Sequence, residues 1–327
     1  FRSSQWLLAA FPQEAGLTPG TRAMEDRDRA LLAREVLAEL LVEAEQRDDR
    51  ETLDTLAMLS IRMGPDKVEK WLLRCASVYG LWVGSGAWQP PLTPRVNILL
   101  GLPADADSSL AAQACGDEVF DVRSLRLCLA AQAQWGTVSG LKCSATIEEW
   151  LAAATEGRAE RISTLSKALF TGEGNPRDLK SVVKIDPAYA DHAVCVQQSI
   201  QRVQQIQALL ALAELLTPAL TLGRSFALAW EEAKQREGLI DFDDQIRRAA
   251  ELLNRAGMAD WIRYKLDRQF DHILIDEAQD TNAAQWEIID ALTGDFFAGE
   301  GQRDGKMRTL FVVGDYKQAI FRFQGTS

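Results

Sequence analysis

Apolar residues recur at helical spacing along most of the chain, which predicts a largely helical protein. The expected helices cover residues 26–47, 50–63, a stretch from 66 onward, several short segments within 119–190, and 190–216. Asp26 or Asp28 is placed to cap the first of these. Gly64 and Pro65 are expected to stop the second, and Pro218 to end or bend the last.

The pattern changes after Gly238. The stretch LIDFDDQIRRAAELLNRAG predicts a short amphipathic helix whose acidic start suits its N-terminal dipole. HILID at 272–276 and RTLFVVGD at 308–315 have the pattern of buried strands, and a helix is expected between them at about 282–292. A strand, a helix and a strand in this order predict a parallel crossover. The chain is therefore expected to be mainly α by content, with a long helical body and a short α/β segment.

Composition is that of an ordinary globular protein, with 47% hydrophobic and 25% charged residues in 327. This length allows two domains, or one domain with a large insertion. Tryptophans of the helical body are expected to anchor its core, namely Trp71, Trp82, Trp88, Trp135, Trp150 and Trp230. The net charge of -11 argues against a protein that coats nucleic acid by bulk electrostatics, although a narrow basic groove remains compatible with it.

The cysteines are scattered, without a CxxC pair, at Cys75, Cys115, Cys128, Cys143 and Cys195. With only two histidines in the chain, this pattern speaks against a zinc or iron–sulfur site. An odd number of cysteines suggests reduced thiols and a cytoplasmic location. No apolar run approaches the roughly 20 residues of a membrane span, so no membrane association is expected.

Carboxylates gather where the two expected strands end. Asp276 and Glu277 follow the first strand, and Gly314 and Asp315 follow the second. Because ligands bind beyond the carboxyl ends of parallel strands, both loops are expected at one edge of the sheet. One acid could hold Mg²⁺ while its neighbour activates a water, and Gln318 could sense a phosphate. An acidic pair after a strand is also a common helix N-cap, and the two-part pattern is what favours the chemical interpretation.

Several segments resemble a known family. ILIDEAQDTNAAQW resembles motif II, the Walker B element, of the UvrD/Rep branch of superfamily 1 helicases, and VVGDYKQAIFRFQG is similar to motif III. LIDFDD resembles the acidic segment ahead of motif II. LLAAFPQEAGLTPGTRAMEDRDRALL resembles the exit from the first motor domain into its inserted helical domain, in the form found in the AddA subunits of bacterial AddAB helicase–nucleases.

The resemblance implies part of a RecA-like P-loop NTPase motor domain with a large helical insertion of the 1B type. Residues 1–18 would end the first motor segment, 19–236 would form the insertion, and 237–327 would return to the motor with motifs II and III. The implied activity is ATP-dependent DNA unwinding in double-strand break repair and recombination, in the 3′→5′ direction that the family has.

The same resemblance implies roles at the nucleotide site, with ATP and Mg²⁺ as cofactors. Asp276 would contact Mg²⁺, and Glu277 would activate the hydrolytic water. Gln279 and Asp280 would support the site and link it to the second motor domain, and Gln318 would report the state of the γ-phosphate. Gly314 and Asp315 would complete the nucleotide loops.

Further roles concern DNA and a protein partner. Phe321 and Phe323 would stack on single-stranded bases, an interaction that tolerates any sequence. The helical insertion would rest on the duplex junction ahead of the motor or on an AddB-like partner. Three positions depart from the wider family: Gln324 replaces a common Arg, Phe321 a common Tyr, and Gln245 a usual Leu.

A phosphate-binding loop of the form GxxxxGK[ST] is missing from the 327 residues. The family places it before LLAAFPQEAG, so the chain is expected to be an internal fragment, inactive in ATP hydrolysis by itself. Two alternatives remain open at this point: a UvrD- or PcrA-like helicase without a nuclease, and a helicase-like scaffold that has lost catalysis.

Overall fold

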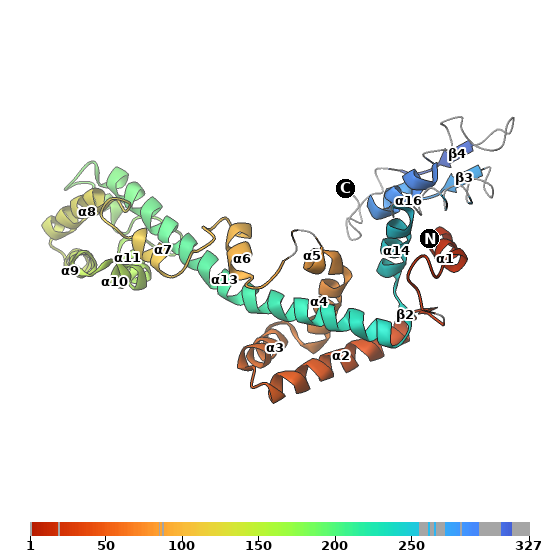
Figure 1. The fold of residues 1–327 in the computed structure, drawn as a ribbon. Coiled ribbons are helices and arrows are strands. Elements are labelled where there is room, and N and C mark those ends of the chain that lie inside the picture. The colour runs from red at the N-terminus through yellow and green to blue at the C-terminus, as the bar shows by residue number, and fades with distance from the viewer. Residues whose placement is uncertain are drawn as a thin grey trace. The chain divides into compact units, whose positions relative to one another are not determined.

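The computed structural model of the chain describes residues 2–18, 20–84, 86, 88–254, 261, 265, 272–281, 283–293 and 309–315. The chain forms two compact units: unit 1 comprises Phe1–Glu43 and Phe226–Ser327, and unit 2 comprises Ala44–Ser225. Helices dominate both units, and strands are few and short (Figure 1). The prediction of a mainly α protein with a small α/β portion is confirmed.

Unit 2 is helical. Its helices are α3 (Arg50–Met63), α4 (Pro65–Ser77), α5 (Tyr79–Val83), α6 (Thr93–Leu99), α7 (Ser109–Gln113), α8 (Val122–Trp135), α9 (Val138–Ala152), α10 (Thr155–Glu160), α11 (Ile162–Leu169) and α12 (Leu179–Val182). Two longer helices, α2 (Asp26–Gln46) and α13 (Tyr189–Arg236), have residues in both units.

Capping residues explain where several of these helices begin and end. The carboxylate of Asp49 accepts a hydrogen bond from the amide of Thr52 at 3.1 Å and so caps α3. Gly64 ends α3 with a φ of 86°, and Pro65 begins α4. This boundary confirms the stop predicted from the sequence. At the start of α2, Asp28 instead reaches back to the amide of Glu25 at 3.4 Å.

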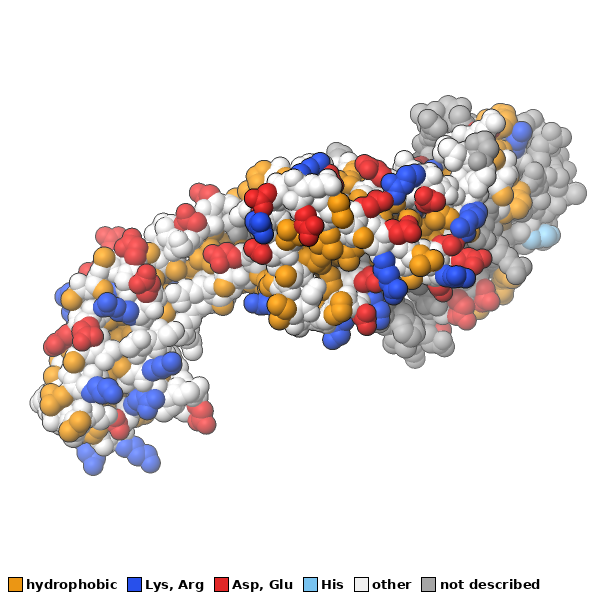
Figure 2. All heavy atoms as spheres, turned by 90° about the horizontal axis from the view of Figure 1, so that it is seen from below, with side chains coloured by type: hydrophobic (Ala, Val, Ile, Leu, Met, Phe, Trp, Pro, Cys, Tyr) orange, Lys and Arg blue, Asp and Glu red, His pale blue; other side chains and the backbone are white. Residues whose placement is uncertain are grey.

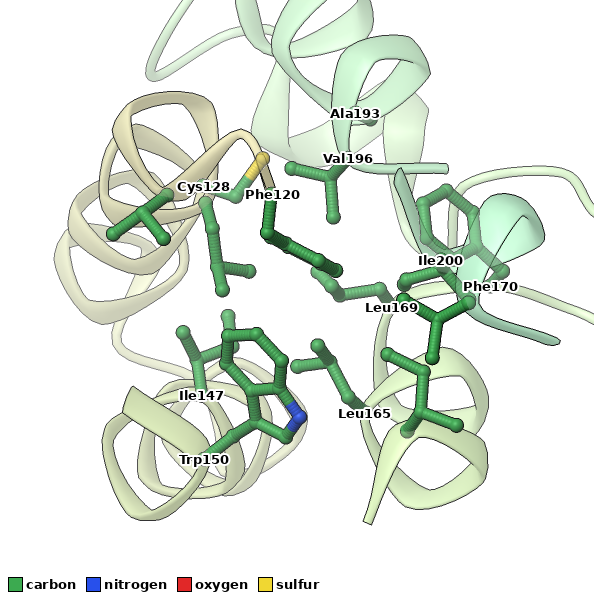
Figure 3. Packing of buried hydrophobic residues seen from close by; sticks show 14 of the residues in the cluster. Phe120, Cys128, Ile147, Trp150, Leu165, Leu169, Phe170, Ala193, Val196 and Ile200 are labelled. Atoms are coloured by element: carbon green, nitrogen blue, oxygen red, sulfur yellow. The ribbon is translucent and has the colours of Figure 1, made fainter. Parts of the chain in front are cut away.

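The core of unit 2 is built around the first part of α13. Figure 3 shows Trp150 and Ile147 of α9 facing Leu165 and Leu169 of α11, with Ile200 of α13 in the same cluster. Burial of side chains of this size stabilises a fold by about 1.5–3 kcal/mol each. The indole nitrogen of Trp150 donates to a backbone carbonyl at 2.8 Å, so its polar atom is satisfied inside the core.

Tryptophans are buried at three of the six positions predicted to anchor the core, whereas Trp71, Trp88 and Trp135 are partly buried. Trp82, Trp150 and Trp230 are 5%, 1% and 3% exposed. A close approach of backbones also shapes the core: a Cβ on Gly140 would lie 2.6 Å from the carbonyl oxygen of Gln132, so only glycine fits where α9 crosses the end of α8.

The sequence predicts that Pro218 ends or bends the long helix, and the first of these alternatives is wrong. α13 continues without a break from Tyr189 to Arg236, and it includes the segment expected to be a separate helix. Ala213, Ala219 and Leu222 are buried on either side of the proline. We attribute the continuity to this packing, which offsets the backbone hydrogen bond that proline cannot donate.

α13 also corrects the expectation about apolar runs. By length and composition it is apolar enough to cross a membrane, and 22% of its most apolar window is buried. A single helix of this kind is weak evidence for a membrane, because core helices of soluble proteins meet the same criterion.

On the face shown in Figure 2, Lys and Arg side chains are interspersed with Asp and Glu.

Unit 1 contains α1 (Arg2–Ala10), β1 (Arg22–Ala23), β2 (Leu239–Ile240), α14 (Phe242–Asn254), β3 (His272–Ile275), the 3-10 helix η1 (Ala278–Asp280), α16 (Ala283–Thr293) and β4 (Thr309–Val312). β1 pairs in parallel with β2, so the segment before the helical region is tied to the segment after it. The core of unit 1 brings together α1, α14 and α16 through Leu8, Phe11, Ile246, Leu253 and Ile288.

The strands β3 and β4 were predicted to be buried, and this is wrong for the described chain. Among their residues only Ile275 is buried, while Leu274 is 69% and Phe311 is 61% exposed. The physical reason is that packed helices cover the faces of a parallel sheet, and among the described elements β3 and β4 chiefly contact each other.

Candidate active site

The carboxyl ends of β3 and β4 lie together. The two strands are parallel, with His272 opposite Thr309 and Ile275 opposite Val312. The pairing continues beyond the strands, because the amide of Val313 donates to the carbonyl of Ile275 at 2.8 Å and that of Ala278 to the carbonyl of Val313 at 2.9 Å. The predicted parallel crossover and the meeting of the two loops at one edge are confirmed.

Asp276 and Glu277 leave the end of β3 as exposed side chains. Glu277 has φ 54° and ψ 47°, a left-handed backbone that residues other than glycine adopt with strain. Its amide donates to Asp276 Oδ1 at 3.0 Å. Glu277 precedes η1 without capping it through its side chain. This carboxylate is therefore not used as a helix cap, the alternative that the sequence left open.

Three residues of the second loop and of η1 complete the edge. The side-chain oxygen of Gln279 accepts a hydrogen bond from the amide of Asp315 at 2.9 Å, and its nitrogen donates to Glu277. Gly314 lies against the side-chain amide of Gln279, and a Cβ at Gly314 would be 2.8 Å from Gln279 Oε1. Gln279, Gly314 and Asp315 are thus brought together with Glu277, although 36 residues separate Gln279 from Asp315.

The fit of Mg²⁺ follows from the donor set. In nucleotide sites Mg²⁺ is held by one or two carboxylates together with phosphate oxygens and water. Asp276 is exposed and one of its oxygens accepts the amide of Glu277, which leaves the other for a cation. Within the described part of the chain, no group of three or more His, Cys, Asp or Glu side chains could hold a metal alone. The residues present therefore fit a nucleotide-borne Mg²⁺ and not a protein-only site.

Some predicted site residues lie outside the described residues. These are Gln318, Phe321, Phe323 and Gln324. For Asp280 the backbone lies in η1, and its side chain is likewise outside the described part. Of the predicted edge, the structure describes the loop after β3 and the first part of the loop after β4.

A second acidic segment, at the start of α14, surrounds a lysine of α13 that the sequence analysis did not single out. Lys234, near the end of α13, is buried with its side chain 4% exposed. Its ammonium lies 2.9 Å from Asp241 Oδ2 and 3.0 Å from Glu231 Oε2, and it also contacts Asp244. Arg247 donates to Asp244 Oδ1 at 2.7 Å. We call these five residues the Lys234 cluster.

The pKa directions of Asp244 and Lys234 follow from their pairing within the cluster. Burial by itself would raise the pKa of Asp244, but the neighbouring Lys234 and Arg247 outweigh burial and lower it. Burial would lower the pKa of Lys234, and the carboxylates of Asp241 and Asp244 raise it instead. A sequence signal existed, because Lys234 and Asp241 flank the turn at Gly238, whose φ is 63°.

Gln245, which departs from the family pattern, is buried and lines a cavity of about 360 Å³. Leu8, Leu17, Thr18 and Thr21 line the same cavity. Its lining does not include Asp276, Glu277 or Asp315, so the substitution lies outside the carboxylate edge.

Free thiols occur at all the cysteines, in agreement with the sequence prediction. Cys75, Cys115, Cys128 and Cys143 are buried, and Cys195 is exposed. Burial raises the pKa of Cys75 to about 11 and that of Cys128 to about 12, so these thiols are protonated near neutral pH. They are therefore structural residues and not candidate nucleophiles.

Comparison with known proteins identifies the family to which the chain is related. The UvrD/REP helicase N-terminal domain family matches residues 5–327. The chain is 36% identical to the AddA subunit of the ATP-dependent helicase/nuclease of Exiguobacterium sibiricum over 104 residues, which cover 32% of this chain and 8% of that protein.

AddA subunits from Listeria monocytogenes and Desulfitobacterium hafniense are 37% and 31% identical over 103 and 126 residues, again 8% of their length. These matches cover 32% and 38% of this chain. The matched stretch is thus less than a tenth of each relative. Because the family match covers nearly the whole chain and its strand–loop pairs meet as the motifs require, the chain belongs to the UvrD/REP helicase N-terminal domain family.

Proposed function

We propose that this chain is part of the first motor domain of an ATP-dependent DNA helicase that acts in double-strand break repair, of the AddA type. One observation carries the proposal. The exposed acid pair Asp276–Glu277 and the pair Gly314–Asp315 lie at one edge of a parallel sheet, joined by Gln279. That edge is where α/β proteins bind nucleotides.

The proposed chemistry assigns one task to each acid. Asp276 would hold the Mg²⁺ of bound ATP, which would neutralise phosphate charge. Glu277 orients and deprotonates the attacking water. Gln279 and Asp280 support these two, Gly314 and Asp315 form the second nucleotide loop, and Gln318 senses the γ-phosphate. Such hydrolysis depends on positioning and on charge neutralisation more than on covalent chemistry.

For DNA, we propose that Phe321 and Phe323 stack on single-stranded bases. Stacking is worth about 1–3 kcal/mol per base and needs no particular sequence. The helical region, taken as residues 19–236 between motor segments 1–18 and 237–327, rests on the duplex junction or on an AddB-like partner. The protein would act in the cytoplasm and translocate 3′→5′.

Glu277→Gln tests the proposal in the full-length gene product. This variant is expected to abolish DNA-stimulated ATP turnover while nucleotide binding persists, because the amide cannot accept the proton of the water. Glu287→Gln is the matched control, since Glu287 is an exposed glutamate of α16 outside the edge.

Two results would count against this function. Normal turnover by Glu277→Gln removes Glu277 from its role. Absence of turnover in the wild-type gene product favours the scaffold that only binds partners. The 327-residue chain alone is expected to release no phosphate from ATP, because its sequence has no GxxxxGK[ST]. Steady release from the pure chain would contradict the proposed division of the site.

A further inference from the structure

The side chain of Gln279 lies between two loops and contacts both. Its oxygen accepts a hydrogen bond from the backbone amide of Asp315 at 2.9 Å, and its nitrogen donates to Glu277 Oε2. One partner is the backbone of the loop after β4, and the other is a carboxylate of the loop after β3. This single side chain therefore connects the two.

Only one orientation of the amide satisfies both contacts. The amide of Asp315 can only donate, and an ionised carboxylate can only accept. The oxygen of Gln279 must therefore face Asp315, and its NH₂ group must face Glu277. A glutamate at this position could still accept from Asp315 but would repel Glu277. An asparagine would be one methylene too short to keep both contacts.

Glycine at position 314 is what allows this approach. A Cβ there would lie 2.8 Å from Gln279 Oε1, 2.9 Å from Ala278 Cβ and 3.1 Å from the nitrogen of Ala278. Contacts that short would push the two loops apart. The amide of Ala278 donates to the carbonyl of Val313 at 2.9 Å, so the bridge continues the strand pairing into the loops.

Glu277 has a backbone that needs support. Its left-handed φ of 54° is strained for a residue with a side chain. Two contacts hold it: its own amide donates to Asp276 Oδ1 at 3.0 Å, and its carboxylate accepts from Gln279. Of these, only the contact with Gln279 reaches the carboxylate that would meet the water.

We propose that Gln279 is a positioning residue that ties the orientation of the Glu277 carboxylate to the backbone after β4. A displacement of that backbone is thereby transmitted to Glu277 through one side chain, so the loop after β4 regulates the acid. The proposal concerns contacts within this one domain. Its catalytic consequence rests on the proposed function, whereas the bridge itself does not.

The bridge can be measured in the chain without any activity. Backbone amide exchange of Asp315, followed by NMR, is expected to be about tenfold faster in Gln279→Ala, which removes the acceptor. In Gln279→Glu the acceptor remains, so protection at Asp315 is expected to stay near the wild-type level. Gln205→Ala and Gln205→Glu are matched controls, because Gln205 is an exposed glutamine of α13. Unchanged exchange in Gln279→Ala overturns the bridge.

The catalytic consequence is measured in the full-length gene product. Both Gln279→Ala and Gln279→Glu are expected to lower kcat for ATP by about 10- to 100-fold with little change in KM, because a misplaced base slows the chemical step.

The outcomes separate this inference from the proposed function. If kcat is unchanged in both variants, Gln279 does not position Glu277. If Glu277→Gln keeps normal turnover, the proposed function fails, while the exchange of the Asp315 amide still decides whether the bridge exists. Near-native helical content by circular dichroism in every variant ensures that the comparison is made on folded protein.

Discussion

Two acidic segments of unit 1 differ in how their charge is neutralised. In the Lys234 cluster, the acids at the start of α14 surround a buried ammonium and a guanidinium. At the edge of the β3–β4 sheet, Asp276 and Glu277 are exposed, and their described contacts are hydrogen bonds from an amide and from a glutamine. The acids of the Lys234 cluster are thus paired with cationic side chains of the protein. Among the described residues, Asp276 and Glu277 accept hydrogen bonds only from neutral donors.

The difference separates structure from chemistry. Buried carboxylates with paired cations are costly to disturb and have no capacity for a ligand. Exposed carboxylates held by neutral donors keep their charge available to an incoming cation. Both segments contain an apolar stretch followed by two acids, as in LIDFDD and ILIDEA, so the pattern of letters alone does not distinguish them.

The largest expected effect is on the buried side of the comparison. Lys234→Met leaves Glu231, Asp241 and Asp244 without their shared cation, and breaking a buried pair in this way costs about 3–5 kcal/mol. This loss of stability is measured by urea unfolding of unit 1, with hydrogen exchange of α14 peptides as the probe. Lys70→Met is the control, because Lys70 is an exposed lysine of α4. A loss below about 1 kcal/mol would show that the cluster is not structural.

A pH series sharpens the same point. The pKa of Asp244 is lowered in the folded state, so its contribution to stability is present above the unfolded value of about 3.9 and is lost as pH falls through the folded pKa. The pKa of Lys234 is raised, so its contribution is lost only as pH rises past about 10.4. The stability gap between wild type and Lys234→Met should therefore be widest between these limits.

At acidic pH, the difference in stability between wild type and Lys234→Met is expected to narrow. It should narrow by about 1.4 kcal/mol for each pK unit by which Lys234 lowers the pKa of Asp244. Urea midpoints of both proteins at pH 7, 5, 4 and 3 check this. A gap that is constant down to pH 3 would mean that Lys234 contributes by packing and not by charge.

Arg247 gives an intermediate case. Its guanidinium donates to Asp244 at 2.7 Å and lies 3.3 Å from Glu231, but its side chain is 31% exposed. Water can therefore replace part of the stabilisation that Arg247 gives to the carboxylates of Asp244 and Glu231. Arg247→Met is expected to cost about 1–2 kcal/mol, below Lys234→Met, in the same unfolding experiment. An equal loss for both variants would place the main counter-charge of Asp244 on Arg247.

Much of this arrangement could be foreseen from local patterns. Asp49, Gly64 and Pro65 mark helix ends by backbone chemistry that acts over a few residues, and the strands before Asp276 and Gly314 follow from short apolar runs. The meeting of the two loops followed from the rule that parallel strands end at one edge.

The errors have a different origin. Pro218 was expected to end or bend a helix because its local preference is strong, yet the helix continues through it and Ala219 and Leu222 beyond it are buried. Lys234 was missed because two of its partners, Asp241 and Asp244, lie across a turn. Gln279 was recognised as part of the site without its link to Asp315. Such contacts depend on tertiary packing, which periodicity and motif spacing do not encode.

The smallest expected effect is on the exposed side of the comparison. Asp276→Asn and Glu277→Gln remove charges from exposed side chains, so each is expected to change the stability of unit 1 by about 0.5 kcal/mol or less. The same urea series measures this alongside Lys234→Met. For Glu277→Gln, the weaker hydrogen bond that an amide oxygen accepts from Gln279 and the relief of repulsion from Asp276 act in opposite directions, which keeps the net change small. A loss comparable to that of Lys234→Met would show that the exposed acids also hold the fold together, and the distinction between the two segments would no longer stand.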